Sequence, residues 1–137
     1  MKLDRFQKSV LLGISLIVLV AIMDKFQYPQ SFWGYSLLLG AVAATIYYFF
    51  RRDKSEALAI FAAFYIMLIF GLEDLIFYLI EGGIPASMPH LFNHMIIGRV
   101  AKLMNLMTVT PLSLIISVGI GGMITYFTTK FLRKQPW

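Results

Sequence analysis

The chain has 137 residues, of which 59% are hydrophobic and 14% are charged, and its formal net charge is +5. Soluble domains average about 25% charged residues, so this composition excludes an ordinary water-facing surface and favours a lipid-facing one. The absence of cysteine excludes disulfides, thiolate metal sites and cysteine nucleophiles. The basic residues stand in short clusters at the ends of apolar segments, which indicates a topology signal and no nucleic-acid partner.

Four apolar segments are long enough to cross a bilayer, whose core of about 30 Å requires roughly 20 residues of helix. In chain order they cover residues 6–23, 32–50, 57–80 and 112–129. The first follows a basic leader but has no small-residue cleavage site, so we expect a retained span rather than a signal peptide. Trp33 and Tyr48, near the two ends of the second, are typical of membrane interfaces. Pro111 suits the first turn of the fourth helix.

The connection between the third and fourth spans predicts a helix of its own. The sequence Gly82-Gly83-Ile84-Pro85 ends the third span, and residues 88–105 form a helical pattern with Pro89 at its start. On a 3.6-residue wheel, His90 and His94 share the face opposite to an apolar one, which is typical of an interfacial or re-entrant helix. We therefore predict one all-α domain over residues 1–137, an integral membrane four-helix bundle with this additional short helix.

The distribution of lysine and arginine predicts the orientation. One side of the bundle would carry nine basic residues, namely Lys2, Arg5, Lys8, Arg51, Arg52, Lys54, Lys130, Arg133 and Lys134. The other side would carry Lys25, Arg99 and Lys102. The positive-inside rule therefore predicts that both termini are cytoplasmic. We expect Arg99 and Lys102 to contact lipid headgroups or an anionic ligand, or to extend toward the interface along apolar surface.

Small residues recur every four positions in two spans, a spacing that lets helix backbones approach closely in lipid. The fourth span carries Ser113, Ser117, Gly121 and Thr125, and the second carries Ser36, Gly40 and Ala44. We expect tight helix packing along these stripes, within the chain or against a partner. Because four short spans bury little surface, the expected partners are the lipid bilayer and either other membrane subunits or a second copy.

The acidic pair Glu73 and Asp74 interrupts the third span and is the main candidate site. A carboxylate inside a membrane is unfavourable and is a functional candidate by default. Three interpretations remain open: a structural ion pair with Arg99 or Lys102, binding of a proton or cation by the acids, and a metal site. The last would combine the acids with His90 and His94, which stand at i and i+4, in a ligand set suited to zinc, iron or copper.

These interpretations give three hypotheses of function. The first is a structural or accessory subunit of a larger membrane complex, because the short chain contains no complete catalytic set. The second is a membrane-embedded metal-binding enzyme or subunit that uses Glu73, Asp74, His90 and His94, with a transition metal as its cofactor. The third is a small proton- or cation-coupled transporter or channel that uses Glu73 and Asp74. The sequence names no catalytic residue and no substrate.

Overall fold

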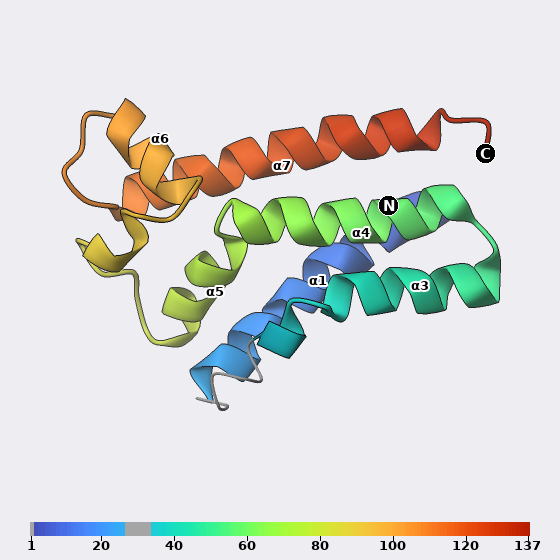
Figure 1. Ribbon diagram of the computed structural model, residues 1–137, viewed down its shortest axis with the longest axis horizontal. Helices are drawn as coiled ribbons and strands as arrows, with labels where there is room; N and C mark the ends of the chain where they lie inside the picture. Colours follow the sequence, from blue (N-terminus) through green and yellow to red (C-terminus); the bar gives the residue numbers. More distant parts are fainter. Residues whose placement is uncertain (1, 27–33) are drawn as a thin grey trace.

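The computed structural model describes residues 2–26 and 34–137. In that part of the chain the regular elements are helical, apart from a single β-bridge between Met88 and Val109. The elements are α1 (Arg5–Lys25), α3 (Leu39–Arg51), α4 (Lys54–Ile69), α5 (Leu72–Ile80), the 3₁₀ helix η1 (Pro89–Leu91), α6 (Ile97–Leu103) and α7 (Pro111–Arg133), as Figure 1 shows. The predicted all-α class is confirmed.

Two helices, α1 and α7, are long and apolar enough to cross a membrane. They have 21 and 23 residues, and at 1.5 Å per residue each is more than about 30 Å long. Asp4 begins α1 with a capping box in which Gln7 is the partner, and Thr110 begins α7 in the same way with Ser113. Pro111 stands in the first turn of α7, as predicted. The predicted spans 6–23 and 112–129 lie inside these helices.

The predicted span 57–80 is not one continuous helix. It is divided into α4 and α5, which meet at a bend of 67°. Gly71 lies at the bend with φ of +94°, a left-handed conformation that side chains disfavour. The Phe70 carbonyl oxygen accepts a hydrogen bond of 2.8 Å from the Ser117 hydroxyl on α7. A tertiary contact therefore satisfies a backbone group at the break.

The predicted span 32–50 is seen only in part. Its first residues, Phe32 and Trp33, lie outside the described residues. Its remainder contains α3, which has 13 residues and is about 20 Å long. A helix of that length is shorter than a bilayer core. The described residues thus contain two candidate crossing helices, or three if α4 and α5 are counted as one broken span.

The predicted single helix over residues 88–105 is wrong. The structure has the short η1, a series of turns, and then α6. The chain folds back so tightly that a Cβ on Gly98 would stand 1.9 Å from the Phe92 carbonyl oxygen. The His94 Nδ1 accepts long contacts of 3.4 Å from the Ile96 and Ile97 amides at the start of α6. His94 therefore lies before that helix, and the shared helical face proposed for the two histidines does not exist.

Helix α4 is the centre of the packing, and α1, α3 and α7 all pack against it (Figure 1). A Cβ on Gly13 of α1 would stand 2.6 Å from the Ile60 carbonyl oxygen, and one on Gly40 of α3 would stand 2.3 Å from the Phe64 ring. On the α7 side, a Cβ on Gly121 would approach the Phe70 Cβ to 2.5 Å. Because these three glycines have no side chain, α1, α3 and α7 can each pack closely against α4 or the adjoining Phe70.

One end of the molecule brings together the start of α1, the α3–α4 turn and the end of α7, on the right in Figure 1. An ion pair of 2.8 Å joins Arg133 to Asp4, and the Ser55 hydroxyl donates to the Leu132 carbonyl oxygen at 2.7 Å. We call this the basic end, because the described members of the three basic clusters belong to these segments. The opposite end contains the end of α1 together with α5 and α6, and we call it the acidic end.

Candidate functional site

The acidic pair lies in the first turn of α5, directly after the break at Gly71. The partial positive charge of a helix N-terminus favours negative groups at this position. Glu73 is 7% exposed, and its Oε1 has no hydrogen-bond partner among the described residues. Asp74 is half-buried. Glu73 is therefore an acid held inside the protein without a donor for one of its oxygens.

A third acid, Asp24 on the last turn of α1, belongs to the same cluster. It lies close enough to interact electrostatically with both Glu73 and Asp74. Asp24 is exposed, Asp74 is half-buried and Glu73 is buried, so the three carboxyls differ in their access to solvent. We call these three residues the acid cluster. Asp24 follows the predicted first span directly and was not singled out from the sequence, although spans one and three were expected to end at the same membrane face.

The two histidines lie near the acid cluster without forming a metal centre with it. Both are close enough to interact electrostatically with Asp74. His90 is exposed, and its Nε2 lies 2.8 Å from the Tyr78 hydroxyl. Within residues 2–26 and 34–137, no three His, Asp or Glu side chains converge as a metal site would require. The structure gives the predicted metal site of Glu73, Asp74, His90 and His94 no support.

Among the described residues, the nearby cations form no ion pair with the acid cluster. Lys25 donates to the Ile80 carbonyl oxygen at 3.2 Å and pairs with Glu81 at 3.8 Å. Lys102 lies over the Phe92 ring, and Arg99 is exposed. Neither Arg99 nor Lys102 forms an ion pair with Glu73 or Asp74 in the described part of the chain. The structural ion pair considered from the sequence is therefore absent there.

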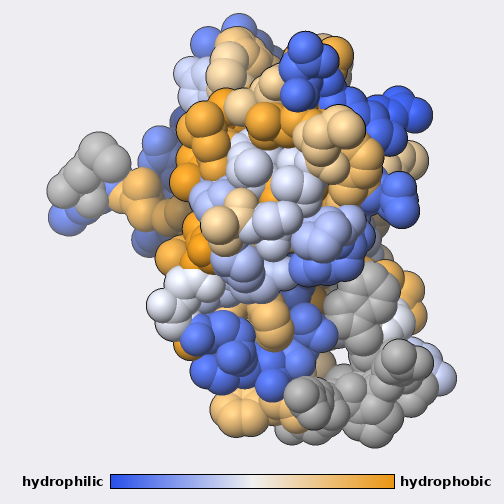
Figure 2. Space-filling model, turned by 90° about the vertical axis from the view of Figure 1, so that its left-hand side faces the viewer, coloured by the Kyte–Doolittle hydropathy of each residue, from blue (hydrophilic) through white to orange (hydrophobic). Residues whose placement is uncertain are grey.

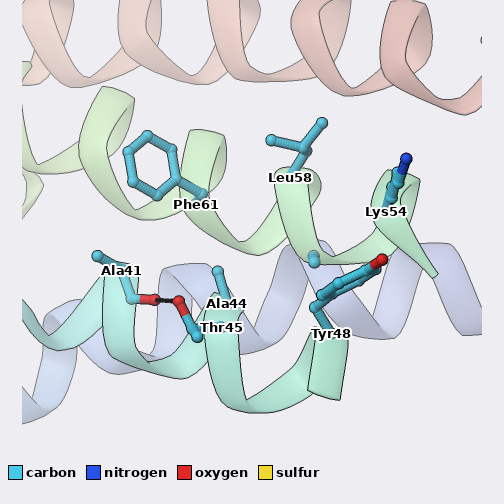
Figure 3. A pocket seen from close by; sticks show the side chains of 8 residues that line it. Ala41, Ala44, Thr45, Tyr48, Lys54, Leu58 and Phe61 are labelled. Carbon is cyan, nitrogen blue, oxygen red and sulfur yellow. Dashed lines mark hydrogen bonds between the residues drawn. The ribbon is translucent and has the colours of Figure 1, made fainter. Parts of the chain in front are cut away.

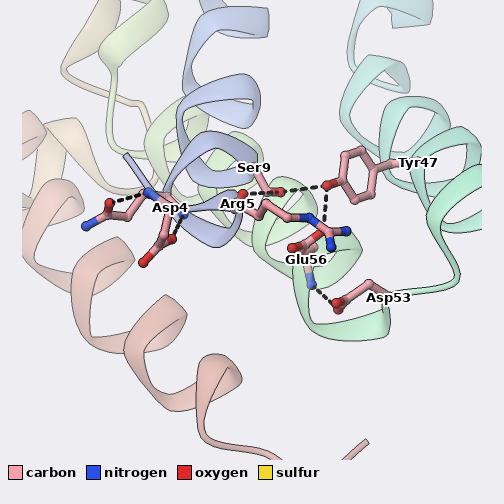
Figure 4. A network of polar contacts seen from close by, with 7 residues as sticks. Asp4, Arg5, Ser9, Tyr47, Asp53 and Glu56 are labelled. Atoms are coloured by element: carbon pink, nitrogen blue, oxygen red, sulfur yellow. Dashed lines mark hydrogen bonds and ion pairs between the residues drawn. The ribbon is translucent and has the colours of Figure 1, made fainter. Parts of the chain in front are cut away.

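Glu56, near the basic end, provides the comparison for Glu73. It is 5% exposed, but it receives a hydrogen bond of 2.5 Å from the Tyr47 hydroxyl and pairs with Arg5 at 3.5 Å. The Ser9 hydroxyl lies 3.2 Å from the same Tyr47 oxygen, and Figure 4 shows that the network joins α1, α3 and α4. Glu56 thus has the partners expected of a buried structural acid. This network was not predicted from the sequence.

The residues predicted to mediate helix packing are all buried. Ser113, Ser117, Gly121 and Thr125 lie on α7, Gly40 and Ala44 lie on α3, and Ser36 precedes α3. Thr125 Oγ1 is, with Glu73 Oε1, one of the two buried side-chain polar atoms that lack a partner among the described residues. A neutral hydroxyl is much less unfavourable in that state than a carboxylate.

Comparison of the chain with protein-family models, with curated proteins and with solved structures found no match.

Proposed function

We propose that this chain is a polytopic integral membrane protein in which Glu73 binds and releases a proton or a small cation. The membrane assignment is supported by α1 and α7, both long and apolar enough to cross a bilayer, and by the broken pair α4 and α5. Large apolar side chains such as Phe50, Phe127 and Phe131 are more than half exposed, which suits a surface facing lipid. We infer four spans, the second of which contains α3.

We infer that both termini face the cytoplasm. The three basic clusters stand far apart in the sequence, but the contacts between Asp4 and Arg133 and between Ser55 and Leu132 join their segments. Clustering of nine lysines and arginines on one side is the distribution that the positive-inside rule associates with the cytoplasmic face. The acid cluster would then lie toward the outer face, where hydrophilic and hydrophobic side chains are intermixed on the surface (Figure 2).

The functional proposal is carried by one observation: the Oε1 of buried Glu73 has no hydrogen-bond partner among residues 2–26 and 34–137. A buried carboxylate without donors is costly, and a proton or a bound cation removes most of that cost. Glu56, at similar burial, has a tyrosine hydroxyl and an arginine in that role. Asp74 and Asp24 both interact electrostatically with Glu73, and the negative charge of these two carboxyls favours a proton or a cation at Glu73.

Reconstitution into proteoliposomes tests this function. Proton flux and Na⁺ or K⁺ flux would be measured for the wild-type chain and for Glu73→Gln, with Glu81→Gln as the matched control. Glu81 is an exposed acid just after the same helix. We expect Glu73→Gln to abolish the flux and Glu81→Gln to retain it. An inactive wild-type chain, or flux that survives Glu73→Gln, would contradict the proposal.

A second candidate function, an accessory subunit of a larger membrane complex, is favoured by the surface around α6. Leu103 and Met107 are 88% and 93% exposed, and Met95 is 64% exposed. These apolar side chains project from the connection between α5 and α7, outside the candidate crossing helices. Purification in mild detergent tests this candidate. A partner that is retained by the wild type and lost in Leu103→Ser with Met107→Ser supports it, and a lone monomer opposes it.

A further inference from the structure

An apolar groove runs between α3 and α4 toward the basic end of the molecule. Its volume is about 420 Å³. Ala41, Thr45, Leu58 and Phe61 are among its lining residues, and Tyr48 and Lys54 lie together at one end of it (Figure 3). The groove is thus amphiphilic along its length, with an apolar body and one end that carries a phenol and an ammonium group.

A second cavity, of about 450 Å³, lies at the basic end and also includes Lys54. Its other charged lining residues are Arg52, Arg133 and Asp53, and it also contains the Trp137 indole. Asp53 accepts from the Glu56 amide at 3.0 Å, and Arg133 is paired with Asp4. Lys54 forms no ion pair with any residue that the structure describes. It is therefore a cation available to a ligand, at the junction of the two cavities.

We propose that the groove and the second cavity together bind one anionic phospholipid of the cytoplasmic leaflet. An acyl chain would lie along the groove between α3 and α4, and the phosphate would contact Lys54 and Arg52. The charge of the second cavity matches an anionic headgroup, and the surface of the groove matches hydrocarbon. Tyr48 and Trp137 are the residue types that favour the boundary between headgroups and acyl chains.

The two cavities favour a lipid over a partner helix. The apolar face of a transmembrane helix would fill only the groove, whereas one phospholipid supplies both a hydrocarbon chain for the groove and an anion for Lys54, which lines both cavities. Basic pockets on the cytoplasmic side of membrane proteins bind such headgroups by this combination of contacts. The proposal depends on the membrane assignment and not on the acid cluster, so Glu73→Gln is expected to retain the lipid.

The test is native mass spectrometry of the detergent-solubilised full chain, titrated with phosphatidylglycerol and, separately, with phosphatidylcholine. We expect phosphatidylglycerol to bind more tightly. Loss of one basic contact is expected to weaken binding about fivefold, so Lys54→Gln should raise the Kd by that factor. Lys134→Gln, an exposed lysine at the same end that lines neither cavity, should leave the Kd unchanged.

A second pair of variants tests the groove. Ala41→Phe places a ring in the groove and should reduce phosphatidylglycerol binding, whereas Val42→Phe, which adds the same ring beside it, should not. If Ala41→Phe lowers thermal stability, Thr45→Trp replaces it, because Thr45 is exposed and lines the same groove. Equal binding of the two lipids, equal effects of Lys54→Gln and Lys134→Gln, or binding unaffected by the groove variants would overturn the proposal.

Discussion

The break in the third span makes Gly71→Ala the most informative single substitution for the fold. An alanine at φ of +94° costs about 1–2 kcal/mol relative to glycine. Its Cβ would also stand 2.7 Å from Ile97 Cδ1 and 3.0 Å from Leu114 Cδ1, and overpacking of this kind costs about 1–3 kcal/mol. We expect Gly71→Ala to lower the free energy of unfolding in detergent by about 2–5 kcal/mol, measured by denaturant titration with circular dichroism.

Two other glycines separate the causes of this effect. Gly82 has φ of +107° but nothing within 4 Å of an added Cβ, so Gly82→Ala should cost only the backbone strain of about 1–2 kcal/mol. Gly119 lies exposed within α7, has no positive φ and has nothing within 4 Å of an added Cβ. Alanine at this position should stabilise the helix by up to about 1 kcal/mol. If Gly71→Ala behaves like Gly119→Ala, then α4 and α5 form one straight helix and the reasoning is refuted.

Two further predictions concern the basic end. Tyr47→Phe removes the hydrogen bond to buried Glu56 and should lower the free energy of unfolding by about 1.5–3 kcal/mol in the same titration. Tyr48→Phe should lower it little, and equal losses in the two variants would contradict the assigned network. The Gln7 amide, followed by the Arg133 guanidinium, holds the pKa of Asp4 below its usual range. A carboxylate whose pKa is lower in the folded state stabilises the fold at pH values above its unfolded-state pKa, and this contribution is lost as the pH falls through its folded-state pKa. The Tm difference between wild type and Asp4→Asn should therefore shrink below about pH 4. A difference that stays constant from pH 6 to pH 3 would show that the ionised Asp4 contributes nothing.

The two unbroken candidate crossing helices could be predicted because their signals are local. Continuous apolar runs define α1 and α7, and Pro111 follows the capping residue Thr110 directly. The break at Gly71 could not be predicted in this way, because glycine is also common inside continuous transmembrane helices. The position of the break depends on the hydrogen bond from the Ser117 hydroxyl and on the close approach of the Ile97 and Leu114 side chains to Gly71. Only the tertiary structure reveals these contacts.

The errors in the connecting segment and in the site have a related cause. Residues 88–105 satisfy a helical wheel, but the close approach of Gly98 to Phe92 turns the chain back before α6 begins. Glu73 and Asp74 could be singled out because they interrupt an apolar run. Asp24 and Glu56 stand at the ends of apolar runs, where a charge predicts topology and nothing more. Their roles depend on which helix ends meet in space.

The proposed exchange of a bound proton or cation at Glu73 can be measured directly. Infrared difference spectroscopy of the reconstituted protein, recorded while the concentration of protons or of Na⁺ is changed, observes carboxyl groups individually when variants are compared. We predict a carboxyl signal that responds to the ion in the wild type and in Glu81→Gln, and that disappears in Glu73→Gln. A spectrum in which Glu73→Gln removes no ion-dependent carboxyl signal would contradict the account.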